Sequence, residues 1–170
     1  LLCCLSASTA WADKATLVSK EGSAYYTAGA ITGVLGTNCA TWTTDGFVMT
    51  QNKNSSSSAV NLTYNEIRVY ASHSLVFTPE SGYNISSVVA TAGNASYANA
   101  LGGSSLENCT KSVTGSVVTI TPTDGSKSFT IKNSEQSRLN TIVVTYSSER
   151  VVSAPTFTPP AGVYTEPQTV

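Results

Sequence analysis

Apolar and polar residues alternate along short segments of this chain, and turn residues separate the segments. The alternation predicts strands at residues 15–19, 46–51, 66–70, 74–78, 84–91, 116–121, 128–131 and 138–147. About eight to nine short strands, with turn signals roughly every ten residues, are typical of an antiparallel β-sandwich. The sequence therefore predicts an all-β, jelly-roll-like sandwich and excludes a helical domain.

One face of each predicted strand is apolar, and these faces are expected to meet between the two sheets. The predicted core residues are Leu17, Phe47, Met49, Ile67, Val69, Leu75, Phe77, Ile85, Val88, Val118, Ile120, Phe129, Ile131, Ile142 and Val144.

Three segments lack this alternation. Residues 25–34 fit either a short helix or an irregular entry segment, and residues 52–59 are so polar that they predict a flexible loop. Residues 92–113 show no clear period. Within them, residues 94–101 fit either a loop or a single helical turn.

The start of the chain has the pattern of a secretory leader. Residues 1–5 are apolar, Ala10 and Ala12 supply the small residues that signal peptidase requires, and charge begins at Asp13. Two alternatives stay open: an apolar first strand, or a lipoprotein in which Cys4 carries the lipid. Under the leader interpretation, the mature protein is secreted or lies at the cell surface.

Composition narrows the choice of partners. Charged residues make up 11% of the chain and the formal net charge is −1, so no basic face is expected that would neutralise nucleic-acid phosphates. Beyond the leader, no apolar run approaches the ~20 residues of a membrane helix, so the mature domain is not expected to be membrane-embedded. Residues 13–147 have the length of one domain. Residues 148–154 then form a linker.

The cysteines and the single histidine limit cofactor chemistry. Beyond the leader only Cys39 and Cys109 remain, and in an oxidising compartment they either form one disulfide or stay as two separate thiols. With His73 as the only histidine and no C-x-x-C spacing, neither a metal site nor a cofactor is predicted.

The last residues follow the pattern P-x-F-x-P-x-x-G-x-Y-x-x-x-Q-x-V from Pro155 to Val170. This segment resembles the start of the small β-sandwich repeat named for the C-terminal domain of chitobiase and β-hexosaminidase. Proteins with such repeats are typically secreted, modular and bacterial. The resemblance therefore implies that further domains follow covalently, and because the repeat is an accessory domain it implies no hexosaminidase activity.

A second similarity covers about residues 15–147. The chain places I-R-V-Y at 67–70, S-L-V-F-T-P at 74–79, G-Y-N-I-S-S-V-V at 82–89 and R-L-N-T-I-V-V-T-Y at 138–146. This order resembles a β-sandwich module of exported Bacteroidetes proteins. The motifs describe strands and turns, so no catalytic residue is transferred.

Candidate catalytic groups are few. Asp45 and Glu66 would make a glycosidase pair only if the fold brought their carboxylates together, and solvated carboxylates at turns are the simpler interpretation. His73 stands between Ser72 and Ser74, but without a nucleophile-elbow motif an exposed turn histidine is predicted. No enzymatic activity is expected.

Aromatic residues make the better functional candidates. Sugar-binding sandwiches stack exposed rings on sugars and add hydrogen bonds from polar neighbours. The candidate ligand-binding residues are Trp42, Asp45, Tyr64, Asn65 and Arg68. The alternative for Trp42 is a place in the core.

These observations leave three hypotheses. The first is a non-catalytic module that binds carbohydrate within an exported, multidomain protein. The second is a structural or adhesive spacer without a ligand. In the third, the chain is an accessory domain of a secreted hydrolase whose catalytic domain lies beyond Val170.

Overall fold

The computed structural model describes residues 12–18, 32–62 and 64–148. The expected leader, linker and second repeat therefore lie outside the described residues, except for the boundary residues Ala12 and Ser148. Most of the segment 25–34 also lies outside them.

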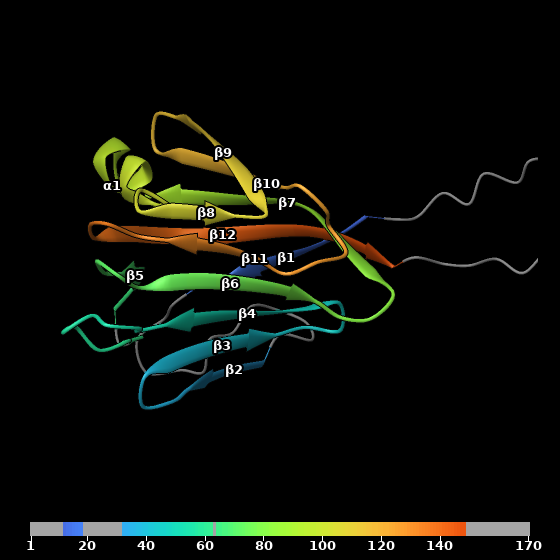
Figure 1. Cartoon of the computed structure of the whole chain (residues 1–170), viewed down its shortest axis with the longest axis horizontal. Coiled ribbons are helices and arrows are strands. Elements are labelled where there is room, and N and C mark those ends of the chain that lie inside the picture. The colour runs from blue at the N-terminus through green and yellow to red at the C-terminus, as the bar shows by residue number, and fades with distance from the viewer. Residues whose placement is uncertain (1–11, 19–31, 63, 149–170) are drawn as a thin grey trace, which may run out of the picture.

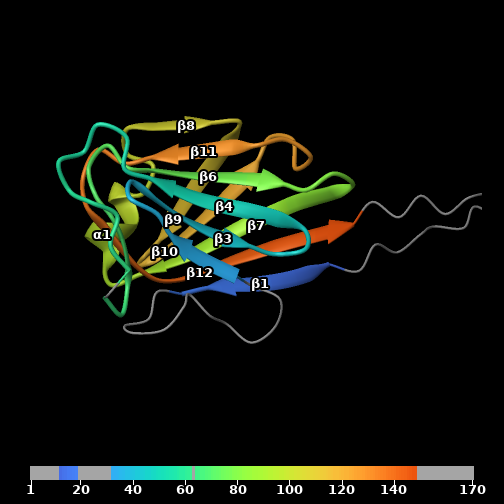
Figure 2. The same ribbon diagram turned by 90° about the horizontal axis from the view of Figure 1, so that it is seen from below.

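The described chain forms two antiparallel sheets that pack face to face, which confirms the predicted all-β sandwich (Figures 1 and 2). Sheet A contains, in order, β1 (Asp13–Leu17), β12 (Ser137–Ser148), β7 (Tyr83–Ala92), β10 (Val117–Pro122) and β9 (Cys109–Thr114), with β5 (Ile67–Val69) beside β12. Sheet B contains, in order, β2 (Thr32–Leu35), β3 (Cys39–Thr43), β4 (Phe47–Asn52), β6 (Ser74–Pro79), β11 (Phe129–Lys132) and β8 (Ser105–Glu107).

The chain crosses repeatedly from one sheet to the other. From β4 onward, β5, β7, β9, β10 and β12 belong to sheet A, while β6, β8 and β11 belong to sheet B. This alternation gives the sandwich its jelly-roll-like character. The expected number of strands was too low, because the described residues form six strands in each sheet.

The additional strands come from segments with weak alternation. β8 is three residues long, and β9 is mainly polar with the sequence CTKSVT. Between β7 and β8, the helix α1 (Ala95–Ala100) confirms the helical-turn alternative. Its first turn is capped by Asn94, whose Oδ1 accepts a hydrogen bond from Tyr97 N at 2.9 Å. At its other end Lys111 Nζ donates to Leu101 O at 2.6 Å.

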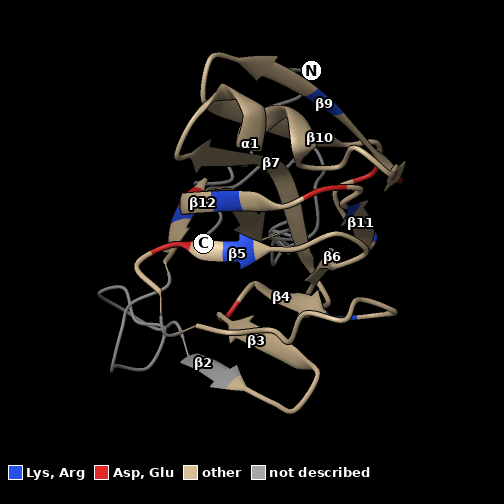
Figure 3. Cartoon of the chain, turned by 90° about the vertical axis from the view of Figure 1, so that its left-hand side faces the viewer, with Lys and Arg blue, Asp and Glu red and all other residues tan. Residues whose placement is uncertain are grey.

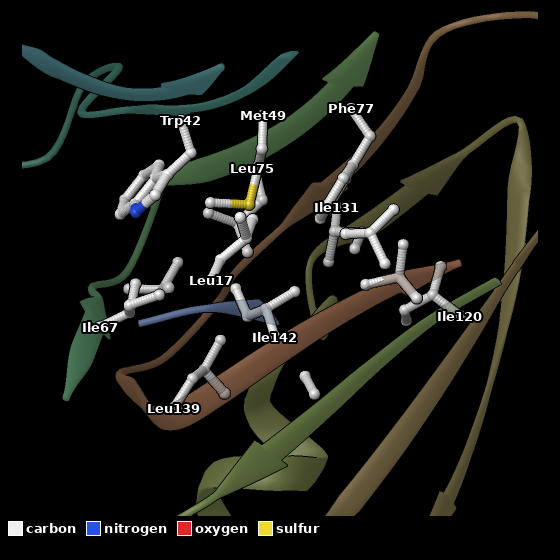
Figure 4. Packing of buried hydrophobic residues seen from close by; sticks show 14 of the residues in the cluster. Leu17, Trp42, Met49, Ile67, Leu75, Phe77, Ile120, Ile131, Leu139 and Ile142 are labelled. Carbon is white, nitrogen blue, oxygen red and sulfur yellow. The ribbon is translucent and has the colours of Figure 1, made fainter. Parts of the chain in front are cut away.

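All the predicted core residues are buried, and they fill the space between the sheets (Figure 4). The burial follows the alternation of the sequence, since β4 alternates between buried and partly buried residues along its whole length. Apolar burial on this scale is the main source of stability for the fold.

The long strand β12 pairs with three other strands of sheet A. It pairs with β7 along one edge, and its other edge is shared by β1, opposite Ile142–Tyr146, and β5, opposite Ser137–Leu139. In this register Arg138 of β12 lies directly opposite Arg68 of β5. We call the end of the sandwich that carries β5, α1 and the start of β12 the α1 end.

Candidate functional site

Trp42 is buried in the core and offers no exposed face to a ligand. Its exposed fraction is 0%, and it is paired in register with Met49, which is equally buried. The expectation of an exposed sugar platform is therefore wrong for this residue. Trp42 lies on the inward face of β3, where Ala40 and Trp42 alternate with the partly or fully exposed Thr41 and Thr43.

Asp45 lies in the turn between β3 and β4, at the end of the sandwich opposite the α1 end. Its Oδ1 accepts a hydrogen bond from Tyr146 Oη at 3.0 Å. Burial, and then the Asp45 carboxylate, raise the pKa of Tyr146 to about 12. Gly46 makes this contact possible, because a Cβ there would collide with the Tyr146 ring. Asp45 is thus separated from the other candidates, and a glycosidase pair with Glu66 does not form.

The fold does bring Tyr64 and Arg68 together. The Arg68 guanidinium lies over the Tyr64 ring, with Cζ 3.3 Å from the ring centroid. Nε and Nη2 of Arg68 both lie 3.0 Å from Glu66 Oε1. Desolvation lowers the pKa of Arg68, but its hydrogen bonds to Tyr70 and Glu66 outweigh this and raise that pKa overall, so the guanidinium stays charged. Asn65, between Tyr64 and Glu66 in the chain, is exposed.

Arg138 and Tyr97 extend this contact. Arg138 Nη1 lies 3.8 Å from Glu66 Oε1, and its Cζ lies 5.2 Å from the centroid of the Tyr97 ring. Tyr97 comes from α1, which packs against β7, β9, β10 and β12. Five residues therefore form a continuous series of contacts at the α1 end. We call them the arginine–tyrosine cluster: Tyr64, Arg68, Glu66, Arg138 and Tyr97.

The pairing of β5 with β12 explains why the cluster is electrostatically unusual. Arg68 and Arg138 are cross-strand neighbours on the outer face of sheet A, and Figure 3 shows their basic positions side by side on the two strands. Like charges placed opposite each other destabilise a sheet. Glu66 lies within 4 Å of both guanidinium groups and partly offsets the repulsion.

Arg138 is the member with unused hydrogen-bonding capacity. Its Nε is buried without a hydrogen-bond partner, although 37% of the side chain is exposed. The distance of 3.8 Å to Glu66 is too long for a hydrogen bond. A guanidinium donates hydrogen bonds in a planar fork, so the two Nη groups of Arg138 can donate to a planar, anionic or hydroxylated group, whereas the buried Nε is out of reach of a ligand.

His73 is buried, which contradicts the prediction of an exposed turn histidine. Its exposed fraction is 0%; Gln51 Nε2 donates to Nδ1 at 3.0 Å, and Nε2 donates to Ser58 O at 2.9 Å. These partners require the neutral imidazole, and burial lowers the pKa of His73 accordingly. Asn54 helps to fix the loop that covers the ring, since its Nδ2 donates to Ser72 O at 2.9 Å. Of residues 52–59, Asn52 ends β4 and residues 53–59 form a loop, as expected, but one held in place.

The two cysteines do not pair. Cys39 and Cys109 are both free thiols, so of the two alternatives the disulfide is wrong. Cys39 opens β3 of sheet B and Cys109 opens β9 of sheet A. Burial raises the pKa of the Cys109 thiol, and its Sγ donates to Thr130 O at 3.7 Å.

The sequence pointed to Tyr64, Asn65 and Arg68 as ligand-binding residues and to Glu66 only as half of a glycosidase pair, and it gave Arg138 no role. The charge of Glu66 next to Arg68 in sequence was a usable signal. Arg138 gave none, because only the register between β5 and β12 brings it to Arg68.

Within the described ranges, no three His, Cys, Asp or Glu residues come together in a way that would hold a metal ion. None of the described segments forms a helix with the length and hydrophobicity needed to cross a bilayer. Comparisons of the chain with protein-family models, curated proteins and solved structures find no match.

Proposed function

We propose that this sandwich is a non-catalytic carbohydrate-binding module of an exported, multidomain protein, and that the arginine–tyrosine cluster is its binding site. The observation that carries the proposal is the series of contacts from Tyr64 through Arg68, Glu66 and Arg138 to Tyr97. Export and further domains are part of the proposal through the leader pattern and the resemblance of residues 155–170.

The cluster combines the groups that sugar recognition needs. Two partly exposed tyrosines provide apolar surface with a polar edge. Between them, guanidinium donors and a carboxylate acceptor can bind neighbouring hydroxyl groups. Asn65 adds an exposed amide beside the cluster.

One observation favours the second candidate, a spacer without a ligand. Trp42, the candidate with the largest ring, is entirely inside the core. If the cluster binds nothing, the remaining features are those of a stable structural unit.

Screening of the full chain on a glycan array tests the proposal. Wild-type protein is expected to bind a subset of glycans, and Tyr97→Leu is expected to weaken binding, because leucine keeps apolar packing but removes the ring. Tyr83→Leu is the matched control, since Tyr83 is also partly exposed and packs on the core at the opposite end. Absence of binding by folded wild-type protein at high concentration would favour the spacer.

A further inference from the structure

We propose that the ligand of the arginine–tyrosine cluster is an acidic glycan, and that Arg138 binds the carboxylate of one of its uronic acid residues. This inference rests on the proposed function and names the class of sugar.

The charge of the cluster favours an anion. Arg68 and Arg138 carry two positive charges and Glu66 carries one negative charge, so the cluster is left with a formal charge of +1. The two guanidinium groups are cross-strand neighbours, and their mutual repulsion is only partly offset by one carboxylate. A carboxylate supplied by a ligand would neutralise the remaining positive charge and offset the rest of this repulsion.

The unused donors identify which arginine would bind it. Arg68 already directs Nε and Nη2 to Glu66 and stacks on Tyr64. Arg138 reaches Glu66 only at 3.8 Å and is the most exposed of the three charged side chains, although its Nε is buried. The planar fork of a guanidinium matches a carboxylate with two parallel hydrogen bonds. Arg138 is therefore the arginine with access, and its two Nη groups are the donors that can meet a carboxylate.

The surroundings favour a sugar-borne carboxylate over a carboxylate on a peptide. The Tyr97 ring lies 5.2 Å from the Arg138 guanidinium, so a pyranose ring whose carboxylate meets Arg138 can lie against the tyrosine. Glu66 and Asn65 then face the sugar hydroxyls, which donate and accept hydrogen bonds. An acidic peptide has no such array of hydroxyls to pair with Glu66 and Asn65.

The test compares acidic polysaccharides with chemically matched neutral ones. Polygalacturonate, alginate and hyaluronan are each offered to the full chain beside the same polymer with its carboxyl groups reduced to alcohols, and polyglutamate is included as a non-sugar polyanion. Affinity is measured by isothermal titration at low and at high salt. The variants are Arg138→Gln, Arg138→Lys and, as a control, Lys127→Gln, which removes an exposed cation paired with Asp124 at the opposite end.

We expect at least one acidic polymer to bind and its reduced form to bind much more weakly. Arg138→Gln should weaken binding by about ten- to a hundredfold, the usual effect of losing a hydrogen-bonded ionic contact. Arg138→Lys should be intermediate, because lysine keeps the charge but loses the fork. Lys127→Gln should bind like the wild type, and high salt should weaken all acidic ligands.

Three outcomes would overturn the inference. Equal binding of acidic and reduced polymers, unaffected by Arg138→Gln, would leave the carbohydrate-binding function but refute the acidic ligand. Equally tight binding of polyglutamate would point to a general polyanion surface. Absence of binding to any glycan, with circular dichroism showing a folded chain, would refute both proposals.

Discussion

The two ends of the sandwich treat their polar side chains differently. At the end opposite α1, Tyr146 donates to Asp45, and Asp124 accepts from Ser126 and pairs with Lys127 at 2.8 Å. At the α1 end the outer cluster leaves Arg138 with an unpaired Nε. The polar groups at the end opposite α1 are paired within the protein, so no ligand is needed to explain them. At the α1 end, Glu66 offsets only part of the positive charge of the two arginines.

A buried layer lies beneath the cluster at the α1 end. Asn133 donates through Nδ2 to Val69 O at 3.1 Å and Ser137 Oγ at 2.9 Å, and accepts from Gly102 N at 2.9 Å. These bonds join β5, the start of β12 and the turn after α1. The elements that carry the cluster are therefore fixed from inside, as a preorganised binding site requires.

Breaking this inner layer should have the largest effect. Asn133→Ala leaves the buried Gly102 N–H and the Val69 carbonyl without their partner, so the free energy of unfolding is expected to fall by about 3 kcal/mol. Urea denaturation followed by circular dichroism measures this, provided the m-value is unchanged. Ser134→Ala, at an exposed neighbour, should stay within about 0.5 kcal/mol of the wild type. A loss below about 1 kcal/mol for Asn133→Ala would show that other contacts hold this end.

His73 makes the stability of the same end depend on pH. Its pKa is lowered in the folded protein because burial disfavours the charged ring, so below the ordinary value of 6.5 the unfolded chain binds more protons than the folded one. The free energy of unfolding should therefore fall as the pH drops below 6.5, by at most about 1.4 kcal/mol per pH unit from this group. His73→Gln should flatten this dependence. An unchanged slope in that variant would assign the effect to carboxylates instead.

At the opposite end, Tyr146→Phe tests a polar contact that is complete. The variant keeps the ring 5.2 Å from Phe47 but loses the hydrogen bond to Asp45, at a cost of about 1 kcal/mol. In the wild type, the raised pKa of about 12 means that the contribution of Tyr146 is intact below pH 10 and is lost between pH 10 and 12. Alkaline unfolding of the two proteins, monitored by circular dichroism, should converge over that range. Parallel curves would exclude this contact as a source of alkaline sensitivity.

The fold was predictable from the sequence wherever one strand face is consistently apolar. β4, β7, β10 and β12 satisfy that condition, and the predicted core residues within them are buried. β8 and β9 escaped prediction because the first is too short to show a period and the second is mainly polar.

The candidate site was predictable only where its residues are neighbours in sequence. Tyr64 and Arg68 met that condition, whereas Arg138 reaches them through strand register. His73 was misjudged for a similar reason, because Gln51 and the loop carbonyl of Ser58 bury it. For Trp42 the signal was present, since the alternation along 39–43 already places it on the inner face with Ala40.

The smallest expected effects on stability distinguish a cluster that is kept for ligand binding from an ion network that stabilises the fold. Glu66→Gln leaves Arg68 and Arg138 opposite each other without a carboxylate, so the free energy of unfolding is expected to fall by up to about 1 kcal/mol. Arg138→Gln relieves the same repulsion, and its stability should equal or slightly exceed that of the wild type. The difference in stability between the two variants should shrink in 1 M salt, because salt screens the interactions between partly exposed charges. Urea unfolding of both variants and of the double variant measures the coupling. If both single variants lose stability to the same extent, the cluster stabilises the fold. If Glu66→Gln lowers the free energy of unfolding and Arg138→Gln raises it, Arg138 destabilises the fold, as expected of a residue that is retained for ligand binding.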